Sequence, residues 1–160
     1  MIISTEFQTP PIVCDYMASL IPKCTSGWWN ILEPTPGIGN LVAAGKEKGF
    51  VSYPKGDFWT FYKKSKARYD YVLMNPPFTP MAEGVSYLKA CMELSDNIIA
   101  LLPWFILINS DSRMNMITDF GLVSVTHLPR KTFPNSRIQC CILELQKGYE
   151  GKTEFTKFYW

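Results

Sequence analysis

The sequence predicts an α/β protein with a doubly wound, mainly parallel sheet that ends in a C-terminal antiparallel hairpin. Three observations lead to this prediction. Short apolar runs typical of buried strands alternate with amphipathic helical segments along most of the chain. Two of these runs end abruptly in turns rich in glycine or proline. The last two strand-like runs are joined by a turn-rich stretch without a helical pattern, which favours an antiparallel pair.

The first half of the chain alternates helices with short strands. Thr9 can act as the N-cap of a first helix, with Pro10 in the first turn and apolar residues on one face as far as Ile21. The elements that follow are a strand over Trp28–Glu33, a glycine-containing turn, a short helix from Asn40 to near Gly49, a short strand over Phe50–Tyr53 and a strand over Tyr69–Met74. We predict a turn and a basic stretch, without a helix, between the last two strands.

The second half contains two helices and three strands. These are a helix over Met81–Ser95, a buried strand over Asn97–Leu102, a helix capped by Ser110 and ended by Gly121, and strands over Leu122–Leu128 and Arg137–Leu145. The aromatic tail from Lys152 to Trp160 is either a docking strand or a contact for a partner. The pattern leaves both interpretations open.

Length and composition limit the class of protein. The chain has 160 residues, of which 47% are hydrophobic and 19% are charged. We therefore expect one folded domain over residues 1–160. The net charge of +2 is weak evidence about partners. The longest apolar run is interrupted by Pro103 and is too short to cross a bilayer. Five cysteines lack metal-ligand spacing and there is one histidine, so we expect reduced thiols, no metal and a cytoplasmic location. The N-terminal residues do not have the pattern of a signal peptide.

The first candidate site is the turn after the strand over Trp28–Glu33. Ligands of open α/β sheets bind beyond the carboxyl ends of the strands. The segment Glu33-Pro34-Thr35-Pro36-Gly37-Ile38-Gly39 connects a strand to a helix start, where backbone N–H groups can face an anionic ligand. Glycine lets a ligand approach the backbone closely. Taken alone, the segment is equally consistent with a plain tight turn.

The second candidate site is Asn75-Pro76-Pro77-Phe78, directly after a buried strand. The prolines fix the backbone and leave carbonyl oxygens that can accept hydrogen bonds. Asn75 adds a side-chain carbonyl acceptor, and Phe78 adds a flat face for stacking. Such acceptors suit a planar ligand with an exocyclic amino group. A plain Pro-Pro turn is the alternative.

These motifs resemble those of a known family. The chain is similar to class I (Rossmann-like) S-adenosylmethionine-dependent methyltransferases of the N6-adenine type. Phe7-Gln8-Thr9-Pro10 resembles the family's F-x-T-P motif, Glu33 to Gly39 its (D/E)-P-x-x-G-x-G loop, and Asn75 to Phe78 its (D/N)-P-P-(F/Y) motif. Gly56-Asp57-Phe58 resembles its G-D-F segment. The motifs occur in the family's order.

The resemblance implies S-adenosyl-L-methionine as cofactor and a role for each matching residue. The residues implied to bind the cofactor are Phe7, Thr9, Pro10, Glu33, Pro34, Thr35, Gly37, Gly39, Asp57 and Phe58. The glycine loop would hold the methionine end, Asp57 the adenine amino group and Phe58 the adenine ring. The catalytic residues would be Asn75, Pro76, Pro77 and Phe78. Asn75 and the Pro76 carbonyl would orient the target amine, and Phe78 would stack on the target base.

The chain departs from the family at two places. Pro36 precedes the first glycine, where the family has a small residue or cysteine. The acidic residue that ends the family's second strand and holds the ribose is not evident, because that strand runs into Ser52-Tyr53-Pro54. The stretch from Phe50 to Tyr69 is too short for the family's strand, helix and strand. We therefore expect a domain shortened between the second and fourth strands of the family.

Substrate and partner follow as further expectations. The candidate substrate contacts are Lys63, Lys64, Arg130, Lys131, Phe133 and Arg137. Cationic side chains can meet a phosphate backbone, although a solvated surface is equally consistent with them. We expect a nucleic-acid partner, foremost DNA, no separate target-recognition domain, and specificity from loops, a specificity subunit or a homo-oligomer. The alternatives are RNA adenine or protein glutamine as the substrate, or a non-catalytic binding module.

Overall fold

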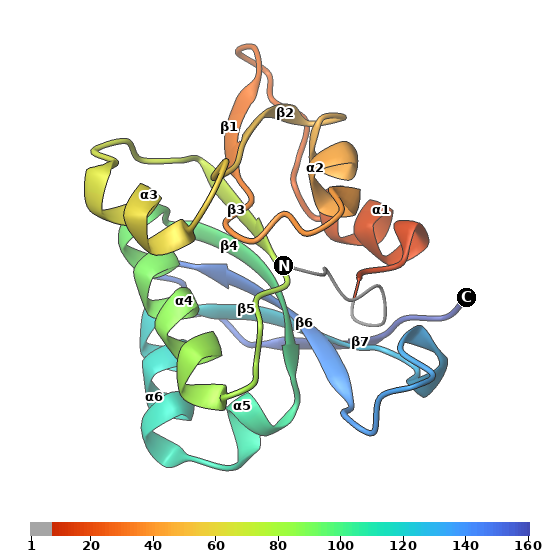
Figure 1. Ribbon diagram of the computed structural model, residues 1–160. Helices are drawn as coiled ribbons and strands as arrows, with labels where there is room; N and C mark the ends of the chain where they lie inside the picture. Colours follow the sequence, from red (N-terminus) through yellow and green to blue (C-terminus); the bar gives the residue numbers. More distant parts are fainter. Residues whose placement is uncertain (1–7) are drawn as a thin grey trace.

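The computed structural model describes residues 8–160, which form a seven-stranded mixed sheet with helices on both faces (Figure 1). The strand order is β2-β1-β3-β4-β6-β5-β7. The strands are β1 (Trp29–Leu32), β2 (Gly49–Ser52), β3 (Tyr71–Met74), β4 (Asn97–Pro103), β5 (Leu122–His127), β6 (Cys140–Gln146) and β7 (Glu154–Lys157). The helices are α1 (Pro11–Ser19), α2 (Asn40–Gly45), α3 (Phe58–Lys64), α4 (Met81–Leu94), α5 (Phe105–Ile108), α6 (Asp111–Phe120) and the 3-10 turn η2 (Arg130–Thr132).

The sheet has a parallel part and an antiparallel part, as predicted. Strands β2, β1, β3 and β4 pair in parallel. Strand β6 pairs antiparallel with both β4 and β5, which confirms the predicted C-terminal hairpin. Strand β4 is almost wholly buried because it lies at the centre of the sheet and is covered on both faces.

Two hydrophobic cores fill the space between the sheet and its helices. One core contains Leu88, Cys91 and Ile117, where α4 and α6 pack on the sheet, and aromatic residues of α3 join it. The other core contains Val13 and Met17 of α1 and Leu41 of α2, on the opposite face (Figure 1). Successive strand residues point to opposite faces, so Val72 lies in the first core and Leu73 in the second.

The structure corrects three expectations about individual elements. Thr9 is not the N-cap of α1: Pro10 holds that position, and no side chain caps the helix. The basic stretch after Asp57 begins with helix α3, whose N-terminal turn is capped by the Asp57 carboxylate. The aromatic residues of α3 lack a simple amphipathic pattern because most of them pack sideways against one another. A further short helix, α5, follows Trp104, between the expected strand over Asn97–Leu102 and the expected helix from Ser110.

The aromatic tail forms a strand at one edge of the sheet. Strand β7 pairs in parallel with β5, so the docking-strand interpretation is the one that the structure supports. Phe158 of the tail also packs on the ring of Tyr16, at a centroid distance of 4.9 Å.

Strand β2 forms the opposite edge, and α3 alone separates it from β3 in the chain. The expected shortening after the second strand is therefore present. Within residues 8–160, no helix is both long and apolar enough to cross a membrane. The same residues contain no cluster of His, Cys, Asp and Glu side chains suited to a metal ion.

Candidate functional site

The two predicted loops follow the carboxyl ends of neighbouring parallel strands and line the same cavity. Strands β1 and β3 are parallel neighbours, so the glycine turn after β1 and the Asn75-Pro76-Pro77-Phe78 turn after β3 emerge side by side. The cavity beside them has a volume of about 870 Å³. Both loops line it, together with Lys55 to Phe58 and part of the segment that leads into β6. Two segments far apart in the sequence thus face one space that is large enough for a small-molecule ligand.

The glycine turn is held by a side chain that we did not single out from the sequence. Gly37 has a φ of 53° and Gly39 a φ of 93°, both in the left-handed region that favours glycine. The Ile38 N–H donates to Oε1 of Gln8 at 3.2 Å. A Cβ on Gly37 would lie 2.5 Å from the same oxygen, so a larger residue here would displace the Gln8 side chain from the turn. Gly39 is the N-cap of α2 and is not among the described residues that line the cavity.

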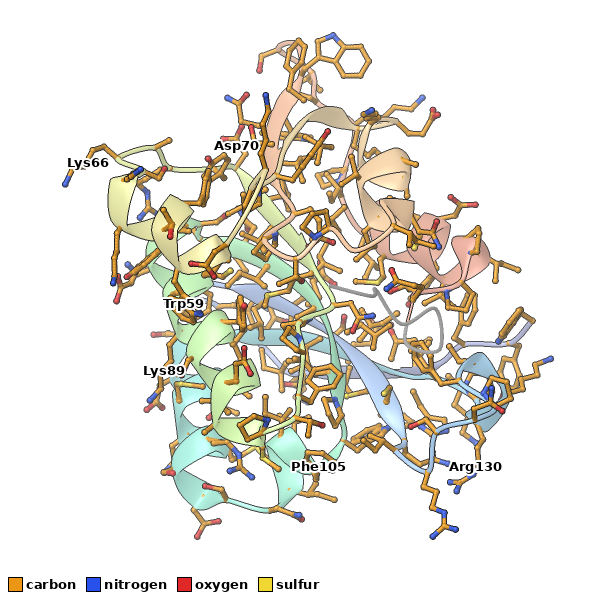
Figure 2. All side chains as sticks on the ribbon, in the orientation of Figure 1. Trp59, Lys66, Asp70, Lys89, Phe105 and Arg130 are labelled. Atoms are coloured by element: carbon orange, nitrogen blue, oxygen red, sulfur yellow. The ribbon has the colours of Figure 1, made fainter. Side chains whose placement is uncertain are left out.

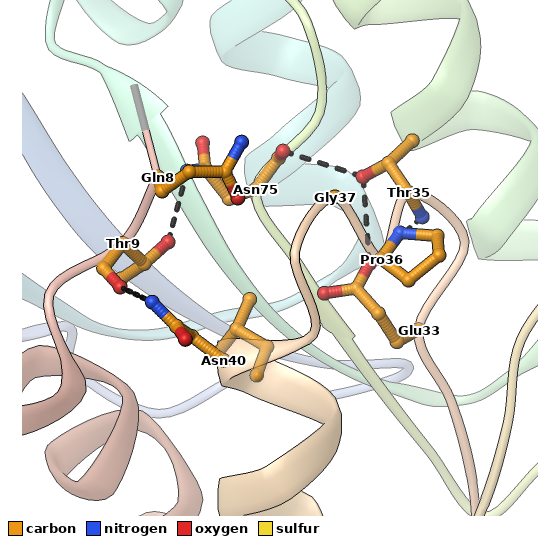
Figure 3. A pocket seen from close by; sticks show the side chains of 9 residues that line it. Gln8, Thr9, Glu33, Thr35, Pro36, Gly37, Asn40 and Asn75 are labelled. Carbon is orange, nitrogen blue, oxygen red and sulfur yellow. Dashed lines mark hydrogen bonds between the residues drawn. The ribbon is translucent and has the colours of Figure 1, made fainter. Parts of the chain in front are cut away.

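A small polar chamber of about 50 Å³ lies behind the glycine turn (Figure 3). It shares Gln8, Thr35, Pro36, Gly37 and Asn75 with the large cavity and adds Thr9, Glu33, Asn40 and Leu41. The acceptors that surround it include carboxylate, hydroxyl and amide oxygens. A chamber lined in this way suits a water molecule or an ammonium group.

Glu33 is the buried acid of this chamber. Only 1% of the residue is exposed, and its Oε1 accepts from the Thr35 N–H at 2.8 Å. Burial raises the pKa of the Glu33 carboxyl to about 8, although the hydrogen bonds from Thr35 lower it. A cation placed in the chamber would favour the charged carboxylate and so would lower this pKa.

Asn75 lies between the two cavities and lines both of them. Its Nδ2 donates to Oγ1 of Thr9 at 2.9 Å, and its backbone oxygen lies 3.3 Å from the Thr35 hydroxyl (Figure 3). The Thr35 hydroxyl also lies 3.4 Å from Oε1 of Glu33. Thr35 therefore connects the buried acid to the asparagine, and Thr9 contacts the asparagine from a third segment.

Pro76, Pro77 and Phe78 continue the wall of the large cavity. Phe78 is half-buried and packs against the core beneath α4. Gly84 in the first turns of α4 allows this packing, because an added Cβ would lie 2.9 Å from the Pro77 oxygen and 3.3 Å from the Phe78 ring.

We expect Gly84→Ala to lower the free energy of unfolding by about 1–2 kcal/mol, because the Pro77–Phe78 backbone must move to admit the methyl group. Urea unfolding followed by circular dichroism measures the change. Gly56→Ala is the matched control, since its added Cβ meets no atom within 4 Å. Equal stability of the two variants would contradict the packing role of Gly84.

Asp57 and Phe58 both line the large cavity, at the end nearest β2. The Asp57 carboxylate is exposed and accepts from the Thr60 N–H at 2.9 Å, and this bond lowers its pKa. Phe58 is only 3% exposed because its ring packs against Tyr62 and Tyr87. The ring thus has little free surface with which to cover a ligand. Beside these two residues the cavity has the cation Lys55, which the sequence motifs did not indicate.

The candidate substrate contacts fall into two groups on opposite sides of the molecule. Lys63 and Lys64 lie in the last turn of α3, which is followed by Lys66 at the upper left of Figure 2. Arg130 lies at the lower right of the same view. Of the six candidates, Phe133 lines the cavity; Lys63, Lys64, Arg130, Lys131 and Arg137 are not among its described lining residues. Nζ of Lys131 bonds the Trp160 carbonyl oxygen and lies 5.2 Å from the centroid of the Trp160 ring.

The remaining predicted residues are placed as follows. Phe7 lies outside the described residues 8–160. Pro10 precedes α1 and does not line either described cavity. Pro34 is buried and lines the large cavity. The wall also contains residues without any motif signal, namely Pro54, Tyr87, Leu101, Ser136, Ile138 and Cys140.

The four buried cysteines, namely Cys14, Cys91, Cys140 and Cys141, have the character of structural thiols. Burial raises the pKa of Cys14 to about 12 and that of Cys140 to about 11. Burial also raises the pKa of Cys91 and Cys141. Thiols with such values remain protonated near neutral pH and are poor nucleophiles.

Comparison with solved structures identifies the fold. The methyltransferase subunit of a type I restriction-modification system from Streptococcus thermophilus matches with a TM-score of 0.73 at 16% identity, over 95% of this chain and 47% of that chain. The M protein of the type I restriction enzyme EcoKI matches with a TM-score of 0.68 at 11% identity, over 90% of this chain and 44% of that one. This chain thus spans about half the length of these proteins.

A 23S rRNA methyltransferase, ErmE, matches with a TM-score of 0.62 at 12% identity, over 88% of this chain and 69% of that chain. No protein-family model matches the sequence, and no curated protein matches it either. At these identities the likeness shows the fold: this chain has the α/β architecture of Rossmann-like methyltransferases.

Proposed function

We propose that this chain is an S-adenosylmethionine-dependent methyltransferase that methylates an exocyclic amine, the N6 of adenine in DNA. The observation that carries the proposal is that the glycine turn and the acceptor group of Asn75 and Pro76 open into one cavity. The fold that the chain shares with methyltransferases supports it.

The residues of the site fit the proposed cofactor. The buried Glu33 borders a polar chamber that suits the ammonium group of an amino acid. The glycine turn beside it contains the Ile38 N–H, which can donate to a carboxylate. In this structure the Ile38 N–H donates to Oε1 of Gln8. Asp57, at the other end of the large cavity, has a carboxylate that can accept from an amino group of adenine. When bound, the cofactor supplies a methyl group on a positively charged sulfur.

The acceptors after β3 would orient the target nitrogen. Asn75 through its side-chain oxygen and Pro76 through its carbonyl would each accept one N–H of the amine. The nitrogen lone pair would then point along the cavity toward the methyl group. Phe78 would stack against the base. Most of the rate gain would come from orientation and from fixed dipoles, without a covalent intermediate on a cysteine.

Substrate access sets a further requirement. An adenine within duplex DNA must leave the helix before its amine can reach a cavity between two loops. We propose that the cavity wall around Phe133 receives the extruded base, because Phe133 lines the cavity. Arg130 and Arg137 flank this wall in the sequence and are exposed, so they can meet phosphates.

We also propose that a partner contributes sequence recognition. The two restriction-system proteins are each about twice as long as the part that this chain covers. Another solved structure that matches the chain comes from work on complex assembly of a type I restriction-modification system. A specificity subunit or a second copy of this chain would supply the contacts for sequence recognition.

The test is methyl transfer from labelled S-adenosylmethionine to duplex DNA of mixed sequence, with nucleoside analysis of the product. N6-methyladenine in DNA is the expected product. RNA of the same sequence and a glutamine-containing peptide are the parallel substrates, and methylation of either of these alone would overturn the DNA assignment. Failure of the chain to bind S-adenosylmethionine at millimolar concentration in calorimetry would overturn the proposed enzyme class.

A further inference from the structure

Thr9 is held firmly although it precedes the first helix. It is only 4% exposed. Its backbone oxygen accepts from Nδ2 of Asn40 in α2 at 2.9 Å and from the Cys14 thiol of α1 at 3.5 Å. The backbone of Thr9 is therefore fixed by contacts from two helices, and its side chain has a defined position.

The hydroxyl of Thr9 contacts the amide of Asn75. Nδ2 of Asn75 donates to Oγ1 of Thr9 at 2.9 Å, across 66 positions of sequence. A side-chain amide has a donor end and an acceptor end that are nearly equal in shape. With the NH2 end bonded to Thr9, the carbonyl end of the amide points away from Thr9. The contact therefore holds the side-chain amide of Asn75 in one place.

We propose that Thr9 is a positioning residue for Asn75, which holds the side-chain amide in the place from which its oxygen can accept from the target amine. This inference rests on the proposed function. Without this contact the amide could turn away from the amine, which would then lose an acceptor at the moment of transfer. The hydroxyl of Thr9 would thus act on the rate of transfer through Asn75.

This role differs from the one that the family resemblance implies. The resemblance places Thr9 among the cofactor-binding residues, and loss of its hydroxyl would then weaken cofactor binding. Positioning of Asn75 instead predicts a lower turnover with cofactor affinity nearly unchanged. The two roles are therefore separated by measuring the dissociation constant and kcat on the same variants.

Thr9→Val is the test variant, because valine keeps the shape and removes the hydroxyl. We expect kcat for methyl transfer to fall about ten- to a hundredfold, since the side-chain amide of Asn75 loses the hydrogen bond to Thr9 that holds it in place. We expect the dissociation constant for S-adenosylmethionine, measured by calorimetry, to change by less than about threefold. Thr9→Ser, which restores the hydroxyl, is expected to recover most of the lost rate.

Thr126→Val is the matched control. Thr126 is also buried, at 1% exposed, and its hydroxyl bonds the Tyr16 hydroxyl at 2.8 Å, away from both described cavities. Loss of this buried hydroxyl is expected to leave kcat unchanged. Thr9→Ala provides the same test if the valine variant does not fold.

Three outcomes overturn the inference. The first is an unchanged kcat in a folded variant that lacks the Thr9 hydroxyl. The second is a loss of cofactor affinity as large as the loss of kcat/KM, which would assign Thr9 to the cofactor. The third is an inactive wild-type protein that transfers methyl to no amine, which would remove the proposed function itself. Activity in the wild type distinguishes the first two outcomes from the third.

Discussion

Replacing Asn75 with alanine is expected to reduce methyl transfer by about 10²–10³-fold or more, because removal of one preorganised polar group from a reacting centre typically costs this much. Asn75 lines both described cavities and is held by Thr9, so its side chain is ordered before any substrate arrives. Alanine removes the acceptor for the target amine. The affinity for S-adenosylmethionine should change far less than kcat.

The measurement is single-turnover transfer of labelled methyl groups to DNA at saturating cofactor. Asn109→Ala is the control, since Asn109 is exposed at the end of α5 and does not line either described cavity. The control should retain the wild-type rate. If Asn75→Ala stays within tenfold of that rate, the assigned role of the asparagine is wrong.

Replacing Glu33 with glutamine is expected to stabilise the ligand-free protein near neutral pH. The folded pKa of about 8 lies above the unfolded reference of 4.5. Between these values the folded state keeps a proton that the unfolded state has released. The free energy of unfolding therefore falls as pH rises from 4.5 toward 8 and levels off above that. At pH 7 the buried carboxyl of Glu33 lowers the free energy of unfolding by about 3 kcal/mol relative to pH 4.5. The uncharged amide of glutamine would avoid this loss of stability.

Thermal unfolding at several pH values tests this prediction. The variant should melt about 5 °C or more above the wild type at pH 7.5 and close to it at pH 4.5. Glu47→Gln, at an exposed carboxyl near the end of α2, should leave the wild-type pH profile unchanged. Parallel pH profiles for Glu33→Gln and the wild type would show that the carboxyl is not buried as described.

The stabilised Glu33 variant should also bind the cofactor less tightly. A cation in the chamber stabilises the charged carboxylate of Glu33. Binding of the cofactor therefore offsets part of the free-energy cost of burying this carboxylate in the wild type. Glutamine has no charge to offer an ammonium group. Calorimetry should thus show weaker binding in the variant that is the more stable of the two, as expected when a strained group serves function.

Much of the fold could be predicted from the sequence because its signals are local. The strand over Asn97–Leu102, observed as β4, was evident from a continuous apolar run, and the turns after β1 and β3 from their glycines and prolines. Helix α3 was missed because its side chains pack on one another and on Tyr87, so their spacing does not follow one simple stripe. Local patterns cannot reveal such lateral contacts.

The place of the cavity could be predicted to the same extent. The motif residues identified both loops, because parallel neighbours place their carboxyl ends together. The positions of Gln8 on the glycine turn and of Thr9 on Asn75 depend on tertiary contacts. The wall formed by Ser136, Ile138 and Cys140 depends on the path of the chain into β6, which no motif marks.

The place of β6 in the sheet bears on how the protein is assembled during folding. This strand is the sixth in the chain, yet it lies between β4 and β5, and its approach completes the cavity wall. Strand β5 therefore has no place beside the parallel strands until residues synthesised later have inserted. Pairings of this kind close long loops and form slowly. A growing chain would carry both sequence motifs well before it possessed a pocket, so ligand binding is a late step in its maturation.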